Sequence, residues 1–86
     1  MKRKDLLAKA AAVTQGERQT NYGNPEDNFK RISDYWTLYL KRHITSTDVA
    51  KMMILMKLAR LDTNPKHDDS WLDIAGYAAC GSEIND

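Results

Sequence analysis

Four charged side chains in the second half of the chain have the types and spacing of an anion-binding site. Lys57 and Arg60 lie three residues apart in an apolar segment, so they share one face if that segment is a helix. Asp69 and Asp73 lie four residues apart, where two carboxylates repel unless a cation lies between them. A buried cation needs an anion, which here is either one of these carboxylates or the phosphate of a ligand. The sequence alone does not decide between a carboxylate of the chain and a ligand phosphate.

Two aromatic residues could stack on the flat ring of a ligand. Tyr22 precedes Gly23 in a polar stretch, where it either anchors a packed loop or stacks on a ligand. Arg18 lies in the same stretch, and Trp71 lies between the two aspartates. The candidate ligand-binding residues are therefore Arg18, Tyr22, Lys57, Arg60, Asp69, Trp71 and Asp73.

Carboxylates could also hold a hard cation. Glu26, with Asp69 and Asp73, could supply the oxygen ligands that such a cation prefers. Acidic residues in the first turn of a helix are also expected from the helix dipole alone, and Glu26 lies in such a turn. These residues by themselves make no cofactor evident.

Four helical segments must position these side chains. Asn24 before Pro25 is typical of a helix start, and Thr45 with Asp48 resembles a capping box. Asp68 or Asp69 is expected to cap the last helix, and no strand pattern or hairpin turn occurs. The segments are expected at about 5–15, 25–42, 46–62 and 69–84. The sequence predicts an all-α fold, a small four-helix bundle in a single domain.

Apolar residues indicate how these helices pack. The second segment has one apolar stripe at three- and four-residue steps, formed by Phe29, Ile32, Trp36, Tyr39 and Leu40. The third segment is apolar almost all round from Val49 to Leu61. The last segment carries small residues that allow another helix to approach closely: Ala75, Gly76, Ala78, Ala79 and Gly81.

Size and composition favour self-association in a reducing compartment. A chain of 86 residues buries only roughly 60% of its unfolded surface, so we expect a homodimer or higher oligomer built around the third segment. The net charge of +1 makes nucleic acid an unlikely partner, although Lys2, Arg3 and Lys4 could contact phosphates. The single cysteine fits the cytoplasm, and the longest apolar run is far shorter than the ~20 residues of a membrane span.

An ordered set of residues along the chain carries a resemblance to a known family. The set is Arg18, Tyr22-Gly23, Pro25-Glu26, Asn28-Phe29, Trp36, Asp48, Met52 to Leu55, Lys57 to Arg60, and DSWLDIAGYAA from Asp69. With MMILMKLARL, these motifs resemble a family of small phage and prophage proteins described as a domain of unknown function. The resemblance covers about Leu6 to Glu83. It implies a protein of the cytoplasm of an infected or lysogenic bacterium.

A more remote resemblance concerns nucleotides. The order Tyr-Gly, Asp, Lys-x-x-Arg and Asp-Ser-x-x-Asp is similar to a phage nucleotide-modification-associated domain and to the MazG-like nucleoside triphosphate pyrophosphatases. It implies an oligomeric helical domain that binds or processes a nucleotide, with Mg²⁺ if it is an enzyme. Lys57 and Arg60 would hold phosphate, and Tyr22 or Trp71 would stack on a base. A carboxylate such as Asp73 would hold a cation or orient the two basic residues. The Glu-Glu-x-x-Glu cluster of the MazG-like enzymes is absent from this sequence.

Two other functions are compatible with four helices. A noncatalytic oligomeric interaction protein would bind a partner through an apolar helix face, which the third segment offers. A helix-turn-helix DNA-binding protein has the right number of helices but needs a basic recognition helix. The second segment has no such excess of charge, because its basic residues are offset by Glu26, Asp27 and Asp34. We therefore rank DNA binding last.

Overall fold

The computed structural model of this chain is all-helical over the residues that it describes, 1–15 and 24–84. Its helices are α1 (Arg3–Val13), α3 (Pro25–Leu40), α4 (Ser46–Thr63) and α5 (Asp68–Glu83). No strand occurs among these residues. The predicted fold class is confirmed, and the predicted boundaries differ from the observed ones by no more than one or two residues.

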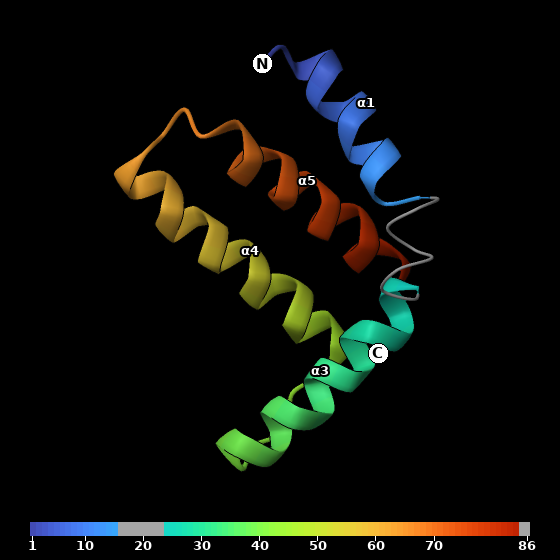
Figure 1. The fold of residues 1–86 in the computed structure, drawn as a ribbon. Coiled ribbons are helices and arrows are strands. Elements are labelled where there is room, and N and C mark those ends of the chain that lie inside the picture. Colours follow the sequence, from blue (N-terminus) through green and yellow to red (C-terminus); the bar gives the residue numbers. More distant parts are fainter. Residues whose placement is uncertain (16–23, 85–86) are drawn as a thin grey trace.

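The helices α4 and α5 form an antiparallel pair that organises the molecule (Figure 1). The short turn formed by residues 64–67 joins them. The helix α1 packs along α5, so α5 lies between α1 and α4 (Figure 1). At the other end of the pair, α3 crosses the beginning of α4. No helix of the described residues is long and apolar enough to cross a membrane.

Side-chain caps explain where the helices begin. The Asn24 side chain accepts a hydrogen bond from the Asp27 amide at 2.9 Å, as its position before a proline predicts. Thr45 and Asp48 form a complete capping box, because each side chain accepts from the other's amide at 3.0 Å. Both predicted starts are confirmed.

The cap of α5 differs from the prediction. His67, not Asp68 or Asp69, is the N-cap, and its ring nitrogen Nδ1 accepts from the Ser70 amide at 3.3 Å. The Ser70 hydroxyl lies 2.7 Å from the same nitrogen. The two aspartates occupy the first turn of α5, where their charges interact favourably with the helix dipole. The expectation of an aspartate cap was wrong because an imidazole nitrogen can accept the same hydrogen bond.

The hydrophobic core lies where α3, α4 and α5 meet. Phe29, Val49 and Ala50 are its buried centre. Partly buried side chains surround them: Ile32, Trp36, Ile44, Met53, Tyr77, Cys80 and Ile84. A Cβ atom built on Gly81 would lie 3.1 Å from the Ala50 Cβ atom, so α4 and α5 approach closely at this glycine. The role predicted for the small residues of α5 is confirmed at this position.

The predicted apolar stripe of α3 is only partly buried. Phe29 is buried, and Ile32 and Trp36 pack against the core, whereas Tyr39 is 86% exposed and Leu40 is 50% exposed. The last turns of α3 project beyond the start of α4, so no described helix covers them (Figure 1). The sequence pattern identifies a face but not how far a neighbouring helix extends along it.

Candidate functional site

Lys57 and Asp73 form an ion pair between α4 and α5. The Lys57 Nζ atom lies 2.8 Å from the Asp73 Oδ2 atom. The lysine is 7% exposed, and the aspartate side chain is 24% exposed. The two helices bring them together because each residue lies on the face that contacts the other helix. Of the two anions considered for Lys57, the structure supplies a carboxylate of the chain itself.

Arg60 and Asp69 do not join this pair. Both residues are exposed, and neither forms an ion pair with a described residue. Arg60 lies three residues after Lys57, so the two side chains are about 60° apart around the helix axis, and that of Arg60 is exposed to solvent. Among the four charged residues predicted to converge, two do so in the described part of the chain.

The carboxylates considered as metal ligands also do not lie together. Among residues 1–15 and 24–84, no three histidine, cysteine, aspartate or glutamate side chains form a group that could hold a metal ion. Asp73 is engaged by Lys57, Asp69 is exposed at the start of α5, and Glu26 is exposed at the start of α3. Asp69, Asp73 and Glu26 are therefore not brought together as one donor set among the described residues.

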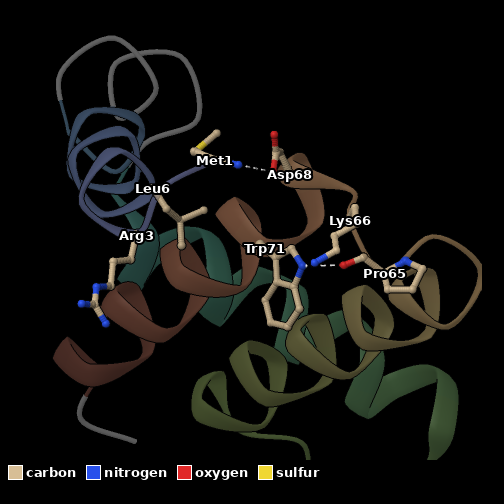
Figure 2. Close-up of a pocket in the computed structure, with 7 residues that line it drawn as sticks. All are labelled: Met1, Arg3, Leu6, Pro65, Lys66, Asp68 and Trp71. Carbon is tan, nitrogen blue, oxygen red and sulfur yellow. Dashed lines mark hydrogen bonds and ion pairs between the residues drawn. The ribbon is translucent and has the colours of Figure 1, made fainter.

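Two predicted ligand-binding residues, Arg18 and Tyr22, lie outside the described residues. Trp71 is described, and it lies away from the Lys57–Asp73 pair in a separate hollow of about 380 Å³. The hollow is lined by Met1, Arg3, Leu6, Pro65, Lys66, Asp68 and Trp71 (Figure 2). These residues come from the beginning of α1, the turn after α4 and the first turn of α5.

The Trp71 ring is held in a defined orientation at the wall of this hollow. Its Nε1–H group donates a hydrogen bond to the Pro65 carbonyl oxygen at 2.9 Å. The residue is 45% exposed, so part of the ring is open to a ligand. Figure 2 shows Leu6 reaching towards the hollow from α1, on the side opposite the turn at Pro65. A fixed, partly open indole is suited to stacking.

The charges at the hollow are mainly positive. Arg3 and Lys66 are exposed, and neither forms an ion pair with a described residue. Asp68, the acidic residue of the lining, lies 3.3 Å from the Met1 amino group and pairs with it. In Figure 2, Lys66 lies near the Trp71 ring, whereas the Arg3 guanidinium is directed away from it. The lining therefore offers an aromatic ring with one cation near it and a second cation that a side-chain rotation of Arg3 would have to bring closer.

Comparison with known proteins identifies the family. A family model described as a domain of unknown function, DUF6378, matches residues 5–85. The chain belongs to the DUF6378 family. It is 46% identical over 79 residues to the Gene 55 protein of Mycobacterium phage D29. It is 44% identical over 75 residues to the Gene 55 protein of Mycobacterium phage L5.

These matches cover most of this DUF6378 chain but only part of its relatives. They include 92% and 85% of the chain, and 52% and 47% of the two phage proteins. The chain thus spans about half the length of the curated relatives that it matches. No solved structure matches it. The predicted resemblance to phage proteins of unknown function is confirmed, and the finer similarity to MazG-like enzymes remains a proposal.

Sequence reasoning did not connect Arg3 with Trp71, and it missed Lys66, the second basic residue of the DUF6378 hollow. Arg3 belongs to a short basic cluster that we considered for phosphate contact, but Lys66 lies in a turn without any motif. The signal that could have found Lys66 is its position beside Pro65, five residues before Trp71, in a turn that must bring α4 and α5 together. The contribution of α1 could not be found this way, because it depends on tertiary packing.

Proposed function

We propose that this DUF6378 chain binds a nucleotide, or a related phosphorylated compound with a flat ring, in the hollow at Trp71. The observation that carries the proposal is the combination of a fixed indole with Arg3 and Lys66, two cations without an acidic partner among the described residues. The ring would stack on the base, and the two cations would contact phosphate oxygens.

Lys57 and Arg60 are the alternative position for the phosphate. Lys57 is almost fully buried, and Asp73 already neutralises its charge at 2.8 Å, so a phosphate would have to displace that carboxylate. Arg60 remains accessible, but it would act alone on this surface. The hollow therefore supports phosphate binding better than the Lys57–Asp73 pair does.

The proposal concerns binding and does not include hydrolysis. A pyrophosphatase of the MazG-like kind uses Mg²⁺ to polarise phosphate and activate water. The carboxylates that could replace its glutamate cluster do not form a group among the described residues. The remote resemblance thus supports a nucleotide as ligand, and no catalytic step follows from the positions of Asp69, Asp73 and Glu26.

A noncatalytic interaction protein is the second candidate. The observation that favours it is an exposed apolar stripe on α3, where Tyr35, Leu38 and Tyr39 are 69%, 77% and 86% exposed. Their spacing of three and four residues places them on one side of the helix. Such a stripe is typical of a helix that contacts a partner.

A thermal-shift titration separates the two candidates. The chain is mixed with nucleoside triphosphates, with and without Mg²⁺, and inorganic phosphate serves as the ring-free comparison. Nucleotide binding predicts a melting temperature that rises with ligand concentration. The Arg3→Gln/Lys66→Gln chain should lose this rise. Lys9→Gln is the matched control, because it removes one positive charge from the same helix α1 outside the hollow.

The outcomes of this titration distinguish the two positions considered for the phosphate and the two candidate functions. A rise that persists in Arg3→Gln/Lys66→Gln but disappears in Arg60→Gln would move the phosphate to the Lys57 surface. A melting temperature that no nucleotide changes would reject nucleotide binding at the hollow and leave the interaction protein as the candidate function.

A further inference from the structure

The outer side of α4 carries a short apolar seam that no described helix covers. Lys51, Leu55, Leu58 and Asp62 recur at steps of four, three and four residues, and all four are exposed. Leu55 is 62% exposed and Leu58 is 43% exposed. Figure 1 shows α5 along one side of α4 and α3 across its beginning, which leaves this side of the helix unpaired.

This spacing is the one by which two α-helices pair along their length. Steps of three and four residues place side chains on a single line along the helix, as in the seam of a coiled coil. Met56 beside the line is 41% exposed, and Ala59 is exposed as well. A flexible methionine can fill gaps against a facing helix, and an alanine lets the backbones approach.

The charges at the two ends of the seam determine which way a second helix can run. In a parallel pair of identical helices, Lys51 would face Lys51, and Asp62 would face Asp62. In an antiparallel pair, Lys51 faces Asp62 of the second copy at both ends, and Leu55 faces Leu58 twice in the middle. The seam is thus complementary to itself in one orientation only, as a two-fold interface requires.

We propose that two copies of this chain pair through α4 in antiparallel orientation. Leu55 and Leu58 form the apolar centre, and the Lys51–Asp62 pairs form its ends. Neither end residue has an ion-pair partner among the described residues of its own chain. The proposal is independent of nucleotide binding, because none of the residues that line the Trp71 hollow belongs to α4.

Charge exchange tests the orientation of the pair. Lys51→Asp makes both ends acidic, and Asp62→Lys makes both ends basic, so each single variant should dimerise roughly tenfold more weakly than the natural chain. Chains with both substitutions should regain dimerisation. An equimolar mixture of the K51D and D62K chains should form a heterodimer in which every end pair is again of opposite charge.

A leucine substitution tests the apolar centre. Leu55→Gln should shift the chain towards monomer, whereas Leu7→Gln is the matched control, because Leu7 is also 62% exposed but lies on α1. Sedimentation equilibrium over a wide concentration range measures the dissociation constant, and circular dichroism verifies that each variant is folded. Both substitutions are at exposed positions, so folding should be retained.

Three results would overturn the proposal. The first is a natural chain that stays monomeric up to millimolar concentration. The second is a dimer that Leu55→Gln leaves as stable as Leu7→Gln does. The third is a pair of single charge variants that weaken the dimer but do not associate when mixed, which would indicate a different partner or orientation for this side of α4.

Discussion

The Lys57 ammonium group and the Asp73 carboxylate lie 2.8 Å apart between α4 and α5. This contact joins a residue near the end of α4 to a residue near the beginning of α5, on either side of the connecting turn. Because Lys57 is 7% exposed, the carboxylate is what allows its charge to be buried. The pair therefore contributes to the structure of the hairpin, and a ligand is not needed to explain the buried lysine.

Removing the carboxylate should destabilise the fold more than removing both charges. Asp73→Ala leaves Lys57 buried without an anion, and such a change costs about 3–5 kcal/mol in the free energy of unfolding. Replacing the pair together, as Lys57→Met/Asp73→Leu, should recover most of this loss. Urea denaturation measures both values. A loss below about 0.5 kcal/mol for Asp73→Ala would show that the pair is no stronger than an exposed ion pair.

The capping box of α4 should make the fold sensitive to acid. The hydrogen bond from the Thr45 amide, the largest cause, holds the pKa of Asp48 below its ordinary value of 3.8. A lowered pKa in the folded state stabilises the fold above pH 3.8, and this contribution is lost as the pH falls through the folded pKa. Asp48→Asn should therefore lose less stability on acidification between pH 5 and pH 2, measured by urea denaturation at each pH. An identical pH dependence in both chains would contradict this account.

Removing the threonine of the same box should weaken α4 at neutral pH. Thr45→Ala deletes the oxygen that accepts from the Asp48 amide at 3.0 Å. Loss of an N-cap of this kind costs about 0.5–2 kcal/mol. Thr45→Ser keeps the acceptor and serves as the control in the same denaturation experiment. Equal losses in the two variants would assign the effect to the methyl group instead.

Two glycines of α5 should respond differently to alanine. A Cβ atom on Gly76 would meet Thr14 Cγ2 at 3.6 Å, an ordinary contact, so Gly76→Ala should gain up to about 1 kcal/mol from helix propensity. On Gly81 it would lie 3.1 Å from the Ala50 Cβ atom, so α4 must shift and the gain should be reduced or reversed. Thermal unfolding compares the two variants. A larger gain at position 81 than at position 76 would show that the close approach of α4 is not rigid.

Local features of the sequence were sufficient to predict the helices. Asn24 before Pro25 and the pair Thr45–Asp48 define helix starts through contacts within one turn, so their prediction needed no knowledge of the fold. The first residue of α5 was predicted less well because His67 competes with two aspartates for the same role.

The site was harder to predict because it depends on how the helices pack. The charge and apolar surroundings of Lys57 indicated that it needs an anion, but only the antiparallel pairing of α4 and α5 selects Asp73. Trp71 was recognised as a stacking candidate, whereas its neighbours Arg3 and Lys66 come from two other parts of the chain. Spacing along one helix could not bring them together.

The central claim, ligand binding at Trp71, is tested most directly by the NMR signals of the two indole N–H groups. The Trp36→Phe chain assigns them, since Trp71 is then the only tryptophan. During titration with a nucleoside triphosphate, we expect the Trp71 signal to shift and saturate while the Trp36 signal stays in place. The shift should be lost in Arg3→Gln/Lys66→Gln and retained in Lys9→Gln. A Trp71 signal that does not move at millimolar nucleotide would contradict the proposed function.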